Sequence, residues 1–287
     1  MKVAILGSTG MLGSMVRRYL SERPEYELTC PSSKELDATY TTVSKLFYIL
    51  RGHDYAINCI GLIKPRIDET DPASVRNAIQ VNSLFPHHLA HAAEWSKCKV
   101  IQIATDCVYS GTGMSAGKHD ELSPHDPLDV YGKTKSLGEV VSPSVHHLRC
   151  SIVGPEQEGR PRDSLLEWFL GQPRGAAVKG FNNHRWNGIT TLAFARICHG
   201  IMSCRLALPP LQHIVPHNSV TKAELLSYFA HFYHRDDIVF DEVAAPIAVD
   251  RSLSTNNRSS NERLWQAAGY SYPPTVQQLI IEMAIYQ

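Results

Sequence analysis

The chain begins with residues 2–13, KVAILGSTGMLG, in which a short apolar run leads into a loop with three glycines. Residues 3–6 are continuously apolar, which is typical of a buried parallel strand. The pattern Gly7-x-x-Gly10-x-x-Gly13 follows, and apolar residues then recur at helical spacing. Glycines at this spacing allow a tight turn and a close approach of a pyrophosphate to the backbone. The sequence therefore predicts a dinucleotide-binding loop. The residues expected to contact the cofactor here are Gly7, Ser8, Thr9, Gly10, Met11, Leu12 and Gly13.

Strand-like and helix-like runs alternate through the first half of the chain. This alternation predicts an α/β fold, a Rossmann-type doubly wound parallel sheet, over residues 1–154. Beyond Gly154 the rhythm breaks into short helices separated by Pro- and Gly-bearing loops. We interpret residues 155–287 as a smaller, mostly helical substrate-binding lobe, from which the chain could return to the sheet within residues 176–220. The predicted strands are 26–30, 55–60, 99–105 and 147–153, and the predicted helices include 40–50, 131–141 and 73–95, the last bent or restarted at Pro86.

Composition and charge exclude several kinds of partner. The 28 basic and 28 acidic side chains balance, so we expect no nucleic acid and no acidic membrane surface. No apolar run approaches the roughly 20 residues that span a bilayer, and the N-terminal run is too short for a signal peptide. Seven cysteines without a C-x-x-C pattern fit a reduced, cytoplasmic setting. His87 and His91 share a helical face, but nothing completes a ligand set, so we expect no metal site.

Residues 131–135, Tyr-Gly-Lys-Thr-Lys, carry the clearest chemical signal. Tyr131 and Lys135 are four residues apart, so on a helix they lie on the same face. A phenol beside an ammonium group can serve as a proton donor, because the positive charge favours the phenolate that remains after transfer. Such pairs are common on surface helices. This one follows a predicted strand that ends at Thr105 and a dinucleotide loop, and this order indicates a catalytic pair.

The end of the second predicted strand indicates the choice of cofactor. An acidic residue at this position would bond the ribose 2′-hydroxyl of NAD. The sequence instead has Ser32, Ser33 and Lys34, with no acid before Glu35. Hydroxyls and a lysine suit a 2′-phosphate, so we predict NADPH, with NADH as the alternative. Asp37 either contacts the adenine or caps the following helix.

These residues together resemble the extended short-chain dehydrogenase/reductases, and among them the dTDP-4-dehydrorhamnose reductase family. The resemblance implies that Thr105, Tyr131 and Lys135 act together to reduce the 4-keto group of a nucleoside-diphosphate 4-keto-6-deoxy sugar. Tyr131 would protonate the carbonyl oxygen, Lys135 would hold the nicotinamide ribose and keep Tyr131 acidic, and Thr105 would orient the same oxygen. The motifs that carry the resemblance are residues 7–13, 58–61, 81–86, 105–111, 131–135 and 149–154.

The same resemblance implies further contacts and a nucleoside-diphosphate sugar as the partner of the C-terminal lobe. Trp186 could stack on a sugar or base, and Arg185 or Arg251 could pair with the diphosphate. The expected additional cofactor contacts are Cys59, Ile60, Gly61, Asn82 and Ile152. The expected substrate contacts are Thr105, Asp106, Cys107, Val108, Trp186 and Arg251.

Cys107 is a departure from the family pattern, because the reductases usually carry an aromatic residue at this position. It also disfavours the nucleotide-sugar 4,6-dehydratases, which follow their threonine with Asp-Glu; a thiol cannot act as that acid. Two alternatives stay open. One is a nucleotide-sugar epimerase of the same fold, which would retain its cofactor. The other is a non-catalytic NADP-binding subunit, similar to the regulatory subunit of methionine adenosyltransferase. A homodimer is a further possible assembly of this chain.

Overall fold

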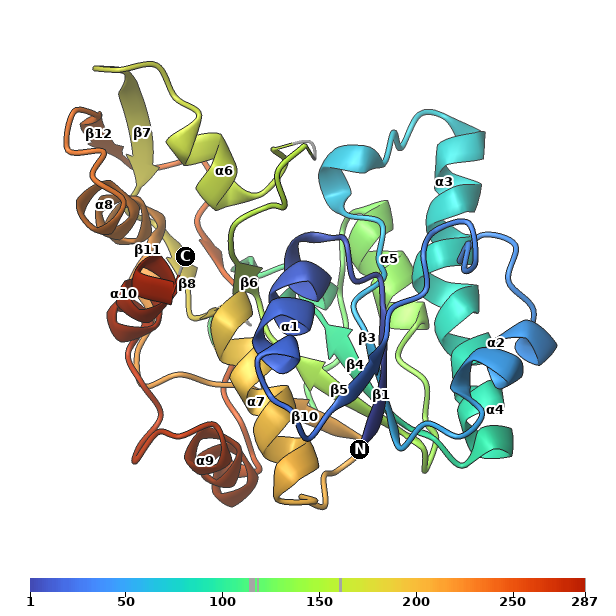
Figure 1. Cartoon of the computed structure of the whole chain (residues 1–287). Helices are drawn as coiled ribbons and strands as arrows, with labels where there is room; N and C mark the ends of the chain where they lie inside the picture. Colours follow the sequence, from blue (N-terminus) through green and yellow to red (C-terminus); the bar gives the residue numbers. More distant parts are fainter. Residues whose placement is uncertain (114–116, 118, 160–161, 287) are drawn as a thin grey trace.

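The computed structural model describes residues 1–113, 117, 119–159 and 162–286. A six-stranded sheet lies at its centre, in the strand order β10-β5-β4-β3-β1-β2 (Figure 1). Each neighbouring pair in this sheet is parallel. The predicted Rossmann-type α/β fold is therefore confirmed. The strands are β1 (Lys2–Leu6), β2 (Glu27–Thr29), β3 (Tyr55–Asn58), β4 (Lys99–Ala104), β5 (Val145–Arg149) and β10 (Leu211–His213).

Helices cover both faces of the sheet because its strands are apolar on both sides. In β1, Val3 and Ile5 are buried in the core that includes α1 and α7, whereas Ala4 and Leu6 are buried in the core that includes α2 and α4. This alternation follows from the two-residue period of a strand. The helices concerned are α1 (Met11–Ser21), α2 (Val43–Leu50), α4 (Phe85–Ser96) and α7 (Thr191–Ser203).

The long helix predicted over residues 73–95 is interrupted. Helix α3 (Pro72–Ile79) passes into a π-helical turn, Gln80–Leu84, before α4 begins at Phe85. Pro86 lies in the first turn of α4, where its missing N–H removes no intrahelical hydrogen bond. The predicted restart is therefore confirmed. The π turn buries Asn82 and Ser83 against the next helix, α5 (Val130–Leu137).

The predicted helix 131–141 and the predicted strand 147–153 differ most from the observed elements. Helix α5 ends at Leu137 rather than near Val141, because Gly138 terminates it and a Cβ there would lie 2.0 Å from the carbonyl oxygen of Asn82. The strand predicted over residues 147–153 is two strands. β5 belongs to the main sheet, whereas β6 (Ile152–Val153) pairs with β9 (Ile189–Thr190).

The second half of the chain contributes to both parts of the molecule. Helix α7 and strand β10 belong to the central sheet unit, while the remaining elements form a lobe beside it (Figure 1). The lobe contains short strands that the sequence pattern did not predict, in the sheets β11-β8-β13 and β12-β7. Its strands are β7 (Ala177–Phe181), β8 (His184–Trp186), β11 (Val220–Thr221), β12 (Val239–Val243) and β13 (Val249–Asp250), and its helices are α6 (Leu165–Leu170), α8 (Lys222–Phe232) and α10 (Val276–Tyr286).

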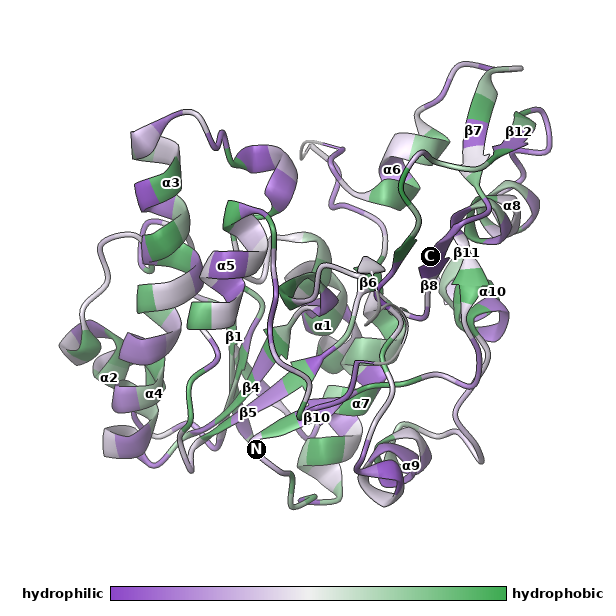
Figure 2. Cartoon of the chain, turned by 180° about the vertical axis from the view of Figure 1, so that it is seen from behind, coloured by the Kyte–Doolittle hydropathy of each residue, from purple (hydrophilic) through white to green (hydrophobic). Residues whose placement is uncertain are grey.

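Helix α9 (Arg258–Ala267) packs against the central sheet unit, beside α7 and β10. It is largely hydrophilic (Figure 2) and is anchored by the fully buried side chains of Leu264 and Trp265. The Trp265 indole donates a 2.9 Å hydrogen bond to the carbonyl oxygen of Val215. Within the described ranges, none of the helices combines the length and the apolar character needed to cross a bilayer.

Candidate active site

The glycine loop presents the start of α1 at the carboxyl end of β1. Gly7 has a φ of 79°, in the left-handed region that favours glycine, and its carbonyl oxygen accepts a 3.1 Å hydrogen bond from the amide of Gly10. A Cβ on Gly13 would lie 2.1 Å from that same oxygen, so only glycine lets helix and loop pack this closely. Gly10 caps α1 without a side-chain hydrogen bond. The first-turn amides and the helix dipole are thus left to favour an anion.

A cleft of about 290 Å³ lies beside this loop. Of the residues after β2 that we expected to select the cofactor, Ser33 and Asp37 line this cleft, whereas Ser32 and Lys34 do not. The amide and hydroxyl of Ser32 each donate a 2.8 Å hydrogen bond to Glu35, so this residue is committed locally. Asp37 does not cap α2, whose cap is Thr42, so that alternative was wrong. The lining residues are Gly7, Ser8, Thr9, Pro31, Ser33, Leu36, Asp37, Ala38 and Ile60.

Three predicted residues, Gly61, Asn82 and Lys135, come together at the carboxyl end of β3. The Asn82 amide is fixed by Leu62, whose N–H donates to it at 2.8 Å and whose carbonyl oxygen accepts from it at 2.9 Å. A Cβ on Gly61 would lie 3.6 Å from Asn82 Oδ1 and 3.7 Å from Lys135 Nζ. Lys135 is buried, and its Nζ makes no hydrogen bond or ion pair with another described residue. Burial lowers the pKa of Lys135, and the carboxylate of Glu139 opposes this shift.

Tyr131 lies one turn before Lys135, at the end of α5 that faces Thr105. Asp129 fixes this end of the helix by accepting a 2.7 Å hydrogen bond from the amide of Gly132. Burial raises the pKa of Tyr131, Cys107 raises it further, and a hydrogen bond with the Thr105 hydroxyl lowers it. Burial is the largest of these causes. The phenol therefore keeps its proton at neutral pH.

The strand end around Thr105 is tightly built. The Thr105 hydroxyl accepts a 3.2 Å hydrogen bond from the amide of Cys107 and donates one of 3.3 Å to Asp106. Burial raises the pKa of the Asp106 carboxyl, and the guanidinium of Arg251 opposes this shift. Val108, by contrast, is fully buried in a small core with Tyr109 and Leu253. Its side chain is therefore directed into this core and not toward the cleft.

The predicted C-terminal residues reach this end of the sheet from the lobe. The Trp186 indole donates a 2.7 Å hydrogen bond to the Ser151 hydroxyl. Arg251 Nε donates to the carbonyl oxygens of Tyr109, at 2.9 Å, and Ser110, at 3.2 Å. Arg185 is exposed and bonds the Ser219 hydroxyl instead, at 2.7 Å. Of the two arginines, only Arg251 lies near the predicted catalytic residues.

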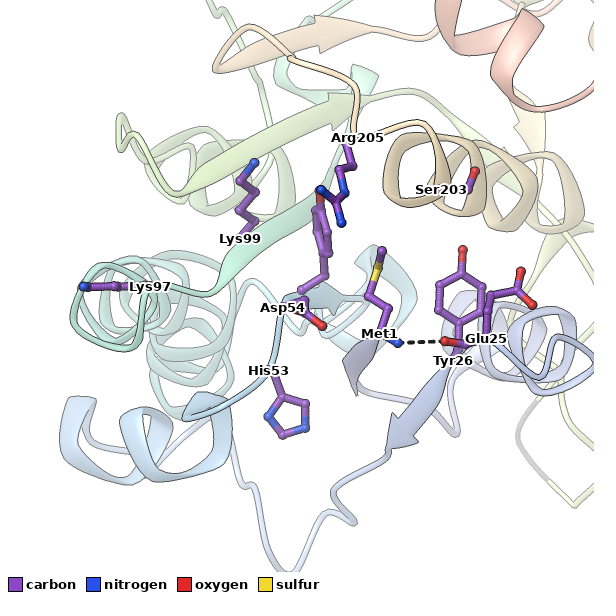
Figure 3. A pocket seen from close by; sticks show the side chains of 10 residues that line it. Met1, Glu25, Tyr26, His53, Asp54, Lys97, Lys99, Ser203 and Arg205 are labelled. Carbon is purple, nitrogen blue, oxygen red and sulfur yellow. Dashed lines mark hydrogen bonds between the residues drawn. The ribbon is translucent and has the colours of Figure 1, made fainter.

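A larger cleft, of about 810 Å³, lies at the opposite edge of the sheet (Figure 3). Its lining includes Met1, Asp54 and Lys99, which lie where β1, β3 and β4 begin, and none of the predicted site residues. Ligands of open parallel sheets bind beyond the carboxyl ends of the strands. The candidate active site is therefore the smaller region between the glycine loop, α5 and the lobe.

The matches to known protein sequences cover the first half of the chain, which forms most of the central sheet. A family model described as the RmlD substrate binding domain matches residues 1–153. The chain belongs to this family. A dTDP-4-dehydrorhamnose reductase of Aggregatibacter actinomycetemcomitans is 29% identical over 138 residues, which cover 48% of this chain and 45% of that protein. A dTDP-4-dehydrorhamnose reductase of Streptomyces griseus is 30% identical over 135 residues, which cover 47% of this chain and 42% of that protein. The chain thus spans less than half the length of these curated relatives.

Solved structures extend the likeness in fold to the whole chain. A dTDP-4-dehydrorhamnose reductase of Bacillus anthracis, determined in complex with NADP, superposes with a TM-score of 0.78 at 18% identity. The superposition covers 100% of this chain and 99% of that chain. The region that matches the RmlD family model holds the glycine loop, Thr105, Tyr131 and Lys135. Trp186 and Arg251 lie outside it.

One site residue of this RmlD-family chain was missed by the sequence analysis. Lys222 begins α8, which Thr221 and Glu224 fix through a capping box. Burial lowers the pKa of its ammonium group, while Asp106 and Cys107 raise it. Lys222 therefore lies near the strand end that carries Thr105. The capping pattern could have located the helix start, but only the tertiary fold places it near Asp106.

A buried network around Arg149 was also missed. Its guanidinium donates to Glu139, to the Tyr109 hydroxyl at 2.5 Å, and to Nε2 of His125 and of His213, both at 2.8 Å. A guanidinium has no acceptor, so both imidazoles must be neutral and protonated at Nδ1. A proton on Nδ1 of His213 also has an acceptor, because this atom lies 2.8 Å from the carbonyl oxygen of Ser254. This network ties the segment before α5 and the segment after β13 to the sheet.

Proposed function

We propose that this protein reduces the 4-keto group of a nucleoside-diphosphate 4-keto-6-deoxy sugar with NADPH. The observation that carries the proposal is the buried ammonium of Lys135, which has no partner among the described residues and lies beside Gly61 and Asn82, one helical turn from Tyr131. An unpaired charge is expensive to bury, so a ligand contact is the reason we infer for its position. Curated relatives that bear the name dTDP-4-dehydrorhamnose reductase support the same substrate class.

The chain's own residues fit a dinucleotide. The amides at the start of α1 suit its diphosphate, the cleft lined by Ser33 and Asp37 suits its adenosine, and Lys135 suits the nicotinamide ribose. When bound, NADPH supplies the hydride. Ser33 and Lys34 follow β2 at the place where an acidic residue would bond the ribose 2′-hydroxyl of NAD. The first acid after them, Glu35, is engaged by Ser32, and Asp37 lies further along the cleft that suits the adenosine. This arrangement supports NADPH over NADH.

Tyr131 is the group that we assign to proton transfer. Its raised pKa keeps the phenol protonated until the carbonyl oxygen gains negative charge. The Thr105 hydroxyl lies near the phenol and would help to orient the oxygen that receives the proton. The positive charge of Lys135 would then favour the phenolate left behind.

The proposal is tested by following NADPH oxidation against a panel of dTDP- and UDP-linked 4-keto-6-deoxy sugars. We expect oxidation in proportion to the ketone consumed with at least one member of the panel. Turnover that needs no added reductant, together with nicotinamide cofactor retained through purification, would identify an epimerase instead. NADPH binding without turnover on any member would favour a non-catalytic subunit.

A further inference from the structure

The three-stranded sheet of the lobe orients its side chains in two opposite directions. Thr221 of β11 and Asp250 of β13 both pair with Arg185 of the central strand β8, so these three residues form one row across the sheet. Arg185 is exposed and bonds Ser219. Because neighbouring residues of a strand point to opposite faces, Trp186 points to the face opposite Arg185, and its partner Val220 on β11 points the same way. Lys222 and Arg251 directly follow the last residues of β11 and β13, where the chain leaves the sheet.

That other face is turned toward the central sheet. Trp186, which follows Arg185, bonds the Ser151 hydroxyl just after β5. Arg251, which follows Asp250, bonds the carbonyl oxygens of Tyr109 and Ser110 just after β4. Lys222 follows Thr221 as the first residue of α8 and is partly buried. The small sheet thus brings one indole and two cations to the strand end that carries the predicted catalytic threonine.

Asp106 is an acidic group near both of these cations. The charge of Asp106 opposes the effect of burial on the pKa of Lys222, and the charge of Arg251 opposes the effect of burial on the pKa of Asp106. Neither Lys222 Nζ nor the terminal guanidinium nitrogens of Arg251 donate a hydrogen bond to any described residue. Hydrogen-bond donors that are both charged and uncommitted therefore lie near the same carboxylate, whose charge also acts on Tyr131.

We propose that Lys222 is a substrate-anchoring residue that, with Arg251, binds the diphosphate of a nucleotide sugar, and that Asp106 is the counter-ion of both cations until the substrate binds. This inference rests on the proposed function for the identity of the ligand. The doubly charged diphosphate matches two cations better than one carboxylate does, and it replaces Asp106 as their partner. Lys222 contributes a compact charge and Arg251 a planar set of donors.

The test compares the binding of dTDP with thymidine, and of UDP with uridine, by calorimetry on the full chain. In the wild type, we expect at least one diphosphate to bind much more tightly than its nucleoside. Lys222→Met should weaken that diphosphate at least tenfold and leave the nucleoside unchanged, and Lys222→Arg should restore most of the affinity. The matched control is Lys179→Met, which removes an exposed lysine from β7 of the same lobe.

The role of Asp106 is tested in the same assay. Asp106→Asn should strengthen diphosphate binding several-fold when Lys222 is present, and by clearly less in the Lys222→Met background. A merely structural role for either residue would not produce this dependence of one substitution on the other.

Three results would overturn the inference: unchanged diphosphate binding by Lys222→Met, an equal loss for diphosphate and nucleoside, or a wild type that binds neither diphosphate more tightly than its nucleoside. Because binding is measured without turnover, an inactive but diphosphate-binding protein would contradict only the proposed function.

Discussion

Lys135 and Arg149 are both buried cations near the carboxyl end of the central sheet, and they are held in opposite ways. Arg149 is fully buried and donates to Glu139, Tyr109, His125 and His213. Lys135 is nearly as buried, yet its ammonium group has no hydrogen-bond partner among the described residues. Only Glu139 opposes the effect of its burial, through charge.

This difference separates a structural cation from a functional one. Arg149 satisfies its donors inside the protein, so its charge serves to hold segments together. The donors of Lys135 are left for something that the chain does not supply, beside a glycine and next to a protonated phenol. The contrast locates the chemistry around α5 and not around the larger group of charged and aromatic residues at Arg149.

The largest effect that we expect is on stability, from Arg149→Met. The substitution leaves the Glu139 carboxylate in a largely buried place without its cation, which should cost about 3–5 kcal/mol of the free energy of unfolding. Denaturant titration measures this loss. The control is Arg185→Met, at an exposed position, which should change the free energy of unfolding by about 0.5 kcal/mol or less. Similar losses for both variants would mean that the network adds nothing.

Tyr131→Phe should have the largest effect on activity. Removal of the phenolic proton should lower turnover about a hundredfold or more, which is the scale of lost acid catalysis. Cofactor affinity should change little, because the ring and the helix remain. Steady-state kinetics with a binding titration of NADPH checks both parts. Turnover like that of the wild type would remove Tyr131 from the mechanism.

Lys135→Met tests the comparison from the other side. Because no internal partner is lost, we expect the free energy of unfolding to stay the same or to rise by about 1 kcal/mol. NADPH should bind at least tenfold more weakly. Denaturant titration and a binding titration on the same sample separate the two effects. A stability loss as large as that of Arg149→Met would show that Lys135 is structural as well.

The Arg149 network should also make the fold sensitive to acid. Burial and the Arg149 charge lower the pKa of His213 to about 4, below its usual value of 6.5. The unfolded chain therefore binds the proton first, so stability is complete above about pH 6.5 and falls as the pH drops toward 4. The unfolding temperature should decrease by about 2–4 °C for each kcal/mol lost. His213→Gln should reduce this pH dependence, whereas His91→Gln, at an exposed position, should not.

The smallest expected effect concerns an exposed cation, Lys34. An exposed charge pair contributes about 0.2–1 kcal/mol, so Lys34→Ala should weaken NADPH by a few-fold at most and NADH less. Paired binding titrations of the two cofactors at low salt measure the difference. Equal losses for both cofactors would discredit the 2′-phosphate assignment.

The parts of this structure that sequence could predict are those fixed by local pattern. The glycine loop, the strand and helix alternation and the spacing of Tyr131 and Lys135 each depend on residues that are close together in the chain. The fates of Val108, Lys222 and Arg149 depend on long-range packing. Val108 is buried because Leu253 covers it, and Lys222 lies near Asp106 because β11 pairs with β8. Neither of these long-range contacts can be predicted from a local sequence pattern. The resemblance to a known family did direct attention to Arg251.

Transfer of deuterium from cofactor to substrate tests the central claim most directly. NADPH labelled at the reactive carbon of its nicotinamide is incubated with the protein and the nucleoside-diphosphate 4-keto-6-deoxy sugars of the panel, and the sugar product is analysed by NMR. We predict deuterium on the newly reduced sugar carbon, in an amount equal to the NADPH oxidised, and almost none of it with Tyr131→Phe. A rearranged sugar without deuterium or net NADPH oxidation would contradict the account, as would label transfer that Tyr131→Phe leaves unchanged.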